Sequence, residues 1–132
     1  MDVFCKIVNG DIPCYKVYED EVCLAFLDVN PVSKGHTIVV PKQHFEEALD
    51  CDMEVYLHIM KVVKTLATTW VNKLDAKGCN IVTNAKEVAG QTVPHFHVHI
   101  IPRYSDEDGY RAEYVKQEGL DLVEIMHVLT VE

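Results

Sequence analysis

The first third of the chain has the apolar and polar pattern of three β-strands. Residues 14–19 alternate apolar and polar side chains, which is typical of a strand with one buried face. Residues 22–29 are almost continuously apolar, and residues 36–41 are rich in the β-branched side chains that favour strands. An Asn-Pro pair and a glycine between these last two segments favour a turn.

A long amphipathic helix is predicted next. Apolar side chains recur at steps of three and four residues, which places them on one face of a helix. This stripe consists of Ile59, Val62, Val63, Leu66, Ala67, Trp70, Val71 and Leu74. Asp50 or Asp52 can cap the start of the helix, and Gly78 can end it.

Two further strands complete the pattern. We expect them over residues 79–85 and 94–102, separated by a glycine-containing loop over residues 86–93. An acidic loop follows over residues 104–113, and the tail over residues 120–129 has a helical pattern. Strands, one inserted helix and further strands predict an α+β fold.

Length, composition and charge narrow the class of protein. The chain has 132 residues, of which 48% are apolar and 25% charged, as in a single soluble globular domain. It shows neither a membrane-length apolar run nor a signal peptide, so we expect a cytoplasmic protein whose five scattered cysteines are reduced. A net charge of −9 argues against a nucleic-acid partner, although backbone N–H groups can still bind a small anion.

The segment VPHFHVHIIPR, residues 93–103, carries the most informative chemistry. His95, His97 and His99 fall on one face of the expected strand, about 7 Å apart, and the apolar residues between them face the helix. A single such histidine is most often a solvated residue, whereas three in register favour a histidine-lined site. Their spacing makes it difficult for all three to reach one metal ion at about 2.1 Å, so separate roles as nucleophile and anion ligand are favoured.

The loop before this strand has the composition of an anion site. Gly90 permits close backbone approach, and the N–H groups of residues 90–92 can surround a phosphate together with the Gln91 amide and the Thr92 hydroxyl. The same Gly-Gln-Thr run is equally suited to a hairpin turn.

The sequence HFHVHII resembles the His-φ-His-φ-His-φ-φ signature (φ is apolar) of the histidine-triad, or HIT, nucleotide-binding proteins. Residues 3–44 are similar to the N-terminal half of that family, and residues 89–104 to its C-terminal motif. The resemblance implies one HIT domain over residues 1–132 with a five-stranded antiparallel sheet, one long helix and one or two short helices, associating as a homodimer. The tail over residues 104–132 contributes least to the resemblance.

The resemblance also implies an activity, which is hydrolysis or transfer at the α-phosphate of a purine nucleotide derivative. By motif position His97 is the nucleophile, and it forms a nucleotidyl-histidine intermediate from which water releases a nucleoside monophosphate. His99 then binds the phosphate and helps to protonate the leaving group, and His36 is a fourth histidine beside the triad. The family needs no metal for this chemistry, since a positive imidazolium and backbone donors can offset the developing charge.

The nucleotide contacts implied by the resemblance come from both halves of the chain. Asp28 matches a carboxylate that binds the ribose, although alone it is more often the end of a strand. The phosphate-side matches are Asn84, Gly90, Gln91 and Thr92, and the apolar base pocket consists of Phe4, Ile7, Phe26 and Leu27. Core packing explains these apolar residues equally well.

A subset of the family holds a structural zinc, and part of its ligand set is present. Cys5, His44 and His95 match three of the ligands in order, while Asp2 stands where the first cysteine is expected. A carboxylate can bind zinc. The alternative is that Cys5 is a small core residue and His44 an exposed loop residue.

Two functions therefore stay open. The first is an enzyme that acts on a nucleoside phosphoramidate or a dinucleoside polyphosphate, and the absence of a tryptophan-rich ending favours the polyphosphates. The second is a nucleotide sensor or dimeric adaptor with little turnover, against which the intact His97 argues. A nucleotidyltransferase is disfavoured by the short chain.

Overall fold

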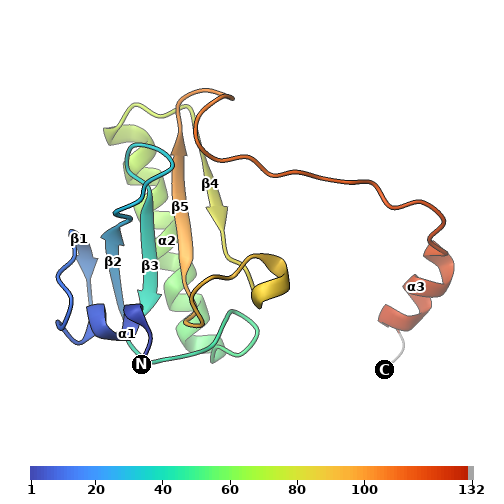
Figure 1. Ribbon diagram of the computed structural model, residues 1–132, viewed down its shortest axis with the longest axis horizontal. Coiled ribbons are helices and arrows are strands. Elements are labelled where there is room, and N and C mark those ends of the chain that lie inside the picture. Colours follow the sequence, from blue (N-terminus) through green and yellow to red (C-terminus); the bar gives the residue numbers. More distant parts are fainter. Residues whose placement is uncertain (131–132) are drawn as a thin grey trace.

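The computed structural model describes residues 1–130, which contain a five-stranded antiparallel sheet of strand order β1-β2-β3-β5-β4 (Figure 1). The predicted α+β fold is confirmed. The strands are β1 Lys16–Glu19, β2 Cys23–Leu27, β3 Thr37–Pro41, β4 Gly78–Val82 and β5 Val98–Arg103. The pairing of β3 with β5 brings a segment near residue 38 beside one near residue 99, and this pairing positions the histidines.

The long helix α2, Met53–Lys73, covers one face of the sheet. Its buried stripe packs against apolar residues of β3 and β5, as predicted; the cluster includes Val39, Ile59, Val62, Val63, Leu66, Ala67, Phe96, Val98 and Ile100. The predicted helix ends were partly wrong. Asp52 is the N-cap residue but its side chain makes no capping bond, and Gly78 opens β4 because the helix already ends at Lys73.

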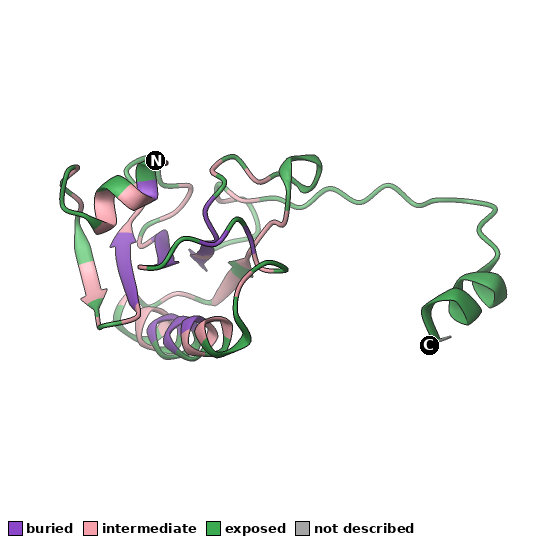
Figure 2. Cartoon of the chain, turned by 90° about the horizontal axis from the view of Figure 1, so that it is seen from below, coloured by how far each residue is buried: buried purple, intermediate pink, exposed green. Residues whose placement is uncertain are grey.

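A short helix that the sequence pattern did not reveal, α1 Val3–Val8, covers the opposite face of the sheet (Figure 2). At six residues it is too short to show a clear period. Its Phe4 packs against the second apolar cluster, which contains Leu24, Phe26, Ile38 and Val40. The sheet thus lies between α2 on one side and α1 on the other.

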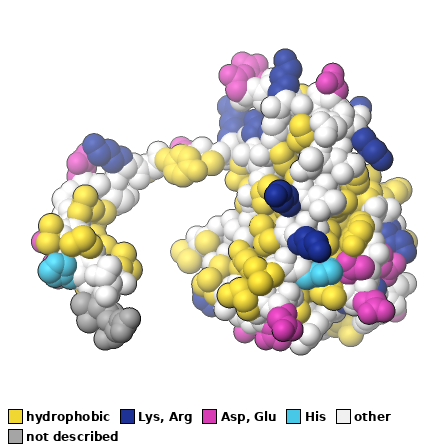
Figure 3. All heavy atoms as spheres, turned by 180° about the vertical axis from the view of Figure 1, so that it is seen from behind, with side chains coloured by type: hydrophobic (Ala, Val, Ile, Leu, Met, Phe, Trp, Pro, Cys, Tyr) yellow, Lys and Arg dark blue, Asp and Glu magenta, His cyan; other side chains and the backbone are white. Residues whose placement is uncertain are grey.

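The C-terminal part of the chain leaves the sheet. Residues 111–130 are exposed throughout, and they contain the predicted helix as α3, Leu122–Thr130 (Figure 1). Apolar side chains of this segment stand clear of the body in the space-filling view (Figure 3). Over the described residues, none of the helices has both the length and the apolar content that crossing a bilayer requires.

Candidate functional site

The histidine segment joins the sheet later than the sequence suggests. β5 begins one residue after His97, so His99 lies in the strand while His95 and His97 lie in the extended stretch before it. There the N–H of Phe96 donates to the carbonyl of Phe45 at 2.7 Å, so this stretch pairs with the loop after β3 and not with a strand. The predicted alternation holds nevertheless, because Phe96 packs in the core while His97 and His99 line a cleft.

This cleft has a volume of about 400 Å³ and lies on the α1 side of the sheet. All four apolar residues expected around a base line it, together with Asp28 and Thr92; the four are Phe4, Ile7, Phe26 and Leu27. The ring of Phe4 meets the ring of His97 edge-on, with centroids 4.9 Å apart. One half of the cleft is therefore apolar and the other carries histidines, which suits a ligand with a flat apolar part and an anionic part.

Further residues line the cleft that sequence reasoning did not single out. They are Val3, Ile12, Pro13, Cys14, Val29, Asn30, Ile38 and Val93. Alternation along β3 could have identified Ile38, since it shares a sheet face with Val40 and both pack with Phe26. The others lie in α1, in turns or in irregular segments, where no periodicity marks the side that a residue faces.

A hydrogen bond to the backbone fixes the position of the proton on His97. Its Nδ1 lies 2.7 Å from the carbonyl oxygen of His95. A carbonyl can only accept, so Nδ1 carries the hydrogen and Nε2 keeps the lone pair. Burial lowers the pKa of His97, which favours the uncharged ring. A neutral imidazole held in this way has Nε2 as its nucleophilic atom.

His36 and His99 form a second fixed pair. His36 Nε2 lies 2.9 Å from His99 Nδ1, and the backbone N–H of Val32 donates to His36 Nδ1 at 3.2 Å. Since this N–H can only donate, His36 Nδ1 accepts, and the hydrogen of the neutral ring lies on Nε2. The carboxylate of Asp28 is 3.6 Å from His36 Nε2. His99 therefore accepts at Nδ1 and carries its own hydrogen on Nε2.

Burial keeps these rings uncharged in the free protein. It lowers the pKa of His99 to about 4, helped by the charges of His97 and His36 and opposed by Asp28. The pKa of His36 is also lowered by burial, against the effect of Asp28. Near pH 7 these lowered pKa values favour the uncharged rings in the free protein, whereas the resemblance implies a positive imidazolium during the reaction.

The loop between β4 and β5 differs from the expected phosphate cradle. It contains a 3-10 turn, η1 Glu87–Ala89, followed by Gly90 with a φ of +104°. The N–H of Gly90 donates to the carbonyl of Glu87, and the N–H of Gln91 donates to that of Lys86. Two of the three predicted N–H donors are thus used inside the loop, because the turn closes on itself. Asn84 packs against Gly90.

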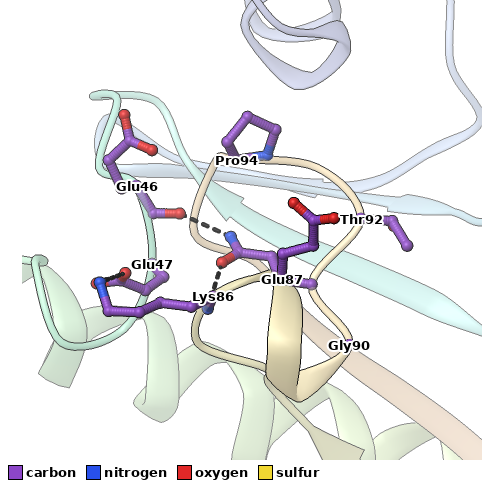
Figure 4. Close-up of a pocket in the computed structure, with 8 residues that line it drawn as sticks. Glu46, Glu47, Lys86, Glu87, Gly90, Thr92 and Pro94 are labelled. Carbon is purple, nitrogen blue, oxygen red and sulfur yellow. Dashed lines mark hydrogen bonds and ion pairs between the residues drawn. The ribbon is translucent and has the colours of Figure 1, made fainter.

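The Gln91 side chain braces this loop, which differs from its predicted role as a phosphate ligand. Its amide nitrogen donates to the carbonyl of Glu46 at 2.7 Å, and its amide oxygen accepts from the N–H of Lys86 at 2.8 Å. Lys86 also pairs with the buried carboxylate of Glu47 at 2.9 Å (Figure 4). These residues line a separate hollow with several charged side chains, and Thr92 lines both this hollow and the cleft.

Three metal-ligand residues predicted from the sequence lie together, and Asp2 joins them. Cys5 Sγ is 3.5 Å from His44 Nδ1 and 3.4 Å from His95 Nδ1, and Asp2 Oδ2 is 3.0 and 3.3 Å from the same two nitrogens. A tetrahedral zinc ion, with bonds of about 2.0–2.3 Å, separates its ligand atoms by about 3.3–3.6 Å. Three of these four separations lie in that range and the Asp2–His44 separation is shorter, so the four side chains are close to the arrangement that such an ion requires.

Local structure holds two of these ligands in place. Asp2 is the N-cap of α1, where Oδ1 accepts from the N–H of Cys5 at 2.8 Å and leaves Oδ2 for the cluster. His95 Nε2 lies 3.0 Å from the carbonyl of Pro41, so it carries the hydrogen and turns the Nδ1 lone pair toward Cys5. The helix cap explains why Asp2 is ordered so close to the chain terminus.

A third group of polar residues has a structural role. His58 lies 2.7 Å from Asp20 Oδ2, which also accepts from the hydroxyl of Tyr18 at 2.7 Å. Asp20 Oδ1 accepts from the N–H groups of Val22 and Cys23. The carboxylate is fully engaged and fastens α2 to the turn between β1 and β2.

Comparison with known proteins assigns this chain to a family. The profile of the HIT domain matches residues 9–106. The chain belongs to the HIT family. A HIT-like protein of Methanocaldococcus jannaschii is 47% identical over 126 residues, covering 96% of each chain. The crystal structure of a HIT family protein from Bacillus anthracis has a TM-score of 0.89 and 41% identity, covering 97% of this chain and 92% of the other.

Other relatives are named for an enzymatic activity or contain a metal. The adenosine 5'-monophosphoramidase of Schizosaccharomyces pombe is 40% identical, with coverage of 81% of this chain and 77% of that enzyme. The adenylylsulfatase of Arabidopsis thaliana is 35% identical, with coverage of 91% and 61%. A zinc-bound histidine triad family protein of Mycobacterium smegmatis has 38% identity and a TM-score of 0.77, with coverage of 82% and 78%. HIT family membership thus supports a nucleotide hydrolase at a general level.

The lowered pKa of His99 makes the stability of this HIT protein depend on pH. The unfolded chain binds a proton on this residue near its usual pKa of 6.5, whereas the folded protein does so only at about 4. The free energy of unfolding should therefore fall as the pH is lowered from about 6.5 to about 4. Urea unfolding across this range should show a smaller fall for His99→Gln. An equal fall for His99→Gln and for His127→Gln, on the exposed α3, would contradict this result.

Proposed function

We propose that the protein hydrolyses a purine nucleotide derivative at its α-phosphate through a nucleotidyl-histidine intermediate. The observation that carries this proposal is the state of His97, whose Nδ1 is tied to a carbonyl while its ring lines the cleft. In the proposed complex the base lies in the apolar half, against Phe4 and Phe26, and Asp28 accepts from the ribose hydroxyls. The α-phosphate lies between His97 and Thr92.

The reaction has two balanced displacements. The lone pair of His97 Nε2 attacks the α-phosphorus, the bond to the leaving group breaks, and its electron pair departs with that group. The Nε2–H of His99 donates a hydrogen bond to the leaving atom, and an amine leaving group takes up its proton from solvent, which leaves the His99 ring neutral. Water then attacks the phosphorus and releases a proton to solvent, the N–P bond breaks with its electron pair returning to His97 Nε2, and the nucleoside monophosphate is released. This route gives His99 a role as donor and His36 a role as its support.

Three kinds of leaving group are candidates in this proposal. One relative is named for its action on an adenosine phosphoramidate and another for its action on an adenylyl sulfate, and dinucleoside polyphosphates are the third substrate type. A turnover panel of these three substrate types ranks them directly by kcat/KM.

The His97→Ala variant should lower kcat by a factor of about 10³ or more while nucleoside monophosphate still binds, because the apolar half of the cleft is unchanged. Brief mixing of the wild-type protein with substrate labelled at the α-phosphate should leave label on the protein, and His97→Ala should not retain it. His127→Ala, outside the cleft, serves as the control.

A nucleotide sensor or adaptor is the alternative function. It predicts tight nucleotide binding in the wild-type protein with no turnover on any substrate of the panel and no labelled protein. Near wild-type turnover by His97→Ala would instead overturn the assignment of the nucleophile.

We also propose that Asp2, Cys5, His44 and His95 hold a structural zinc ion. Cys5→Ala should lose most of the zinc bound by protein expressed with added zinc, as measured by elemental analysis, because the thiolate is the strongest ligand of the set. Asp2→Cys should bind zinc more tightly in a chelator competition. The control is Cys51→Ala, whose thiol lies outside the cluster. Equal zinc contents in Cys5→Ala and Cys51→Ala would rule out the site.

We propose finally that residues 1–132 form one HIT domain that acts as a homodimer. Two features support this. β4 is an edge strand of the sheet, and α3 exposes a stripe of apolar residues at helical spacing, Leu122, Ile125, Met126 and Leu129. A nine-residue helix is marginal alone in water and gains stability when such a stripe is covered.

Light scattering should give the wild-type protein twice the mass of one chain. The double variant Ile125→Glu, Leu129→Glu should dissociate at a higher protein concentration, because charges replace the stripe. Glu124→Gln, on the same helix, keeps the apolar residues and should match the wild type. A wild-type protein of single-chain mass at high concentration would exclude the dimer.

A further inference from the structure

A close contact between two loops lies behind the histidine pair. Gly109, in the loop after β5, packs against the backbone of Val32, in the loop before β3. A Cβ on Gly109 would lie 2.0 Å from the carbonyl oxygen of Val32 and 2.8 Å from its carbonyl carbon, distances that no side chain tolerates. The backbone of Gly109 is not in the left-handed region, so the glycine is needed for space rather than for conformation.

The same two loops are joined a second time. The hydroxyl of Tyr104 donates to the carbonyl of Lys34 at 2.7 Å, and the carboxylate of Asp108 accepts from the N–H of Tyr104 at 2.8 Å. Asp108 also pairs with Arg103 at the end of β5. The loop over residues 104–109 is thus anchored to the sheet and in turn holds the loop over residues 29–35.

Val32 connects these two loops to the histidine pair. Its N–H donates to His36 Nδ1 at 3.2 Å, and His36 Nε2 lies 2.9 Å from His99 Nδ1. If the N–H of Val32 moved away, neutral His36 could carry its hydrogen on Nδ1 and present a lone pair at Nε2. His99 would then have to donate from Nδ1, and its Nε2 would lose the hydrogen that faces the leaving group.

We propose that Gly109 and Tyr104 are positioning residues that seat the Val32 amide and thereby hold His99 in the form with its hydrogen on Nε2. This proposal rests on the proposed function for its effect on turnover, but its effect on the histidine rings is independent of any reaction. The acidic loop after β5 would thus position the histidine pair, although it contributes no residue to the lining of the cleft itself.

The proposal has a distinctive dependence on pH. A doubly protonated His36 carries hydrogens on both nitrogens, so its Nε2 must donate to His99 whatever happens at Val32. The titratable groups that face the pair are Asp28 and His97, and Asp28 favours this protonation when Val32 has moved. A defect caused by a lost Val32 contact should therefore be largest at high pH and should shrink as His36 becomes protonated.

The test compares Gly109→Ala with Gly78→Ala, a glycine of β4 where an added Cβ meets nothing within 4 Å. In ¹⁵N-histidine NMR spectra, the wild-type protein should show His36 and His99 both protonated at Nε2. Gly109→Ala should show mixed ring forms at both residues, and Gly78→Ala should match the wild type. At pH 8 the kcat of Gly109→Ala should fall by a factor of about 2 to 10, with little change in KM. The deficit should be smaller at pH 5, because burial lowers the pKa of His36 and protonation of this ring requires a pH below its usual pKa of 6.5.

A second variant keeps the test decisive if Gly109→Ala fails to fold. Tyr104→Phe removes the bond to Lys34 without adding an atom, so it should produce a smaller shift of the same ring signals in the same direction. Unchanged ring forms in both variants would overturn the proposal, as would a deficit in kcat that is the same at every pH. Ring forms as expected in a protein without turnover would overturn the proposed function and leave this inference standing.

Discussion

Backbone groups occupy one ring nitrogen on each of three histidines, and the division of roles depends on this constraint. The carbonyl of Pro41 takes Nε2 of His95, the carbonyl of His95 takes Nδ1 of His97, and the N–H of Val32 takes Nδ1 of His36. A neutral imidazole has one donor and one acceptor, so each bond decides what the other nitrogen can do.

The same residue type thereby acquires three different capacities. His95 turns a lone pair toward Cys5 and Asp2, as a metal ligand requires. His97 keeps a lone pair on Nε2, as a nucleophile requires. His36 directs a donor at His99, which leaves His99 with a hydrogen on Nε2. None of these capacities follows from the side chain alone, because a free imidazole exchanges its two ring forms readily.

The sequence predicted the parts of this site that depend on alternation and on the family motif. The stripe of α2, the core position of Phe96 and the shared cleft of Phe4, Phe26 and His97 all follow from those patterns. The start of β5 did not, since alternation continues through His95 and His97 although the backbone N–H of Phe96, between them, donates to the loop carbonyl of Phe45. Alternation of side chains predicts which side of the backbone each residue faces, but it does not predict which carbonyl accepts a hydrogen bond from the backbone.

Residues that act through tertiary contacts were likewise beyond sequence reasoning. Gln91 carries an amide that could bind phosphate. In the structure this amide instead forms hydrogen bonds with backbone groups of Glu46 and Lys86, which lie on separate loops. From the sequence, Gly109 reads as an ordinary glycine of a surface turn. Only its close approach to the backbone of Val32 shows why a side chain is excluded there. Both depend on distances between segments that are far apart in the chain.

The electrostatics of the cleft have a consequence for how an anion binds. The chain has a net charge of −9, burial keeps His97, His99 and His36 uncharged, and Asp28 adds a carboxylate to the lining. Repulsion between the negative net charge of the protein and the negative charge of a nucleotide therefore opposes the approach of the nucleotide. The affinity must come from the apolar half of the cleft and from hydrogen-bond donors such as His99 Nε2–H. In the proposed reaction, bound phosphate favours protonation of the rings, so the charge that assists the reaction develops only once the substrate is in place.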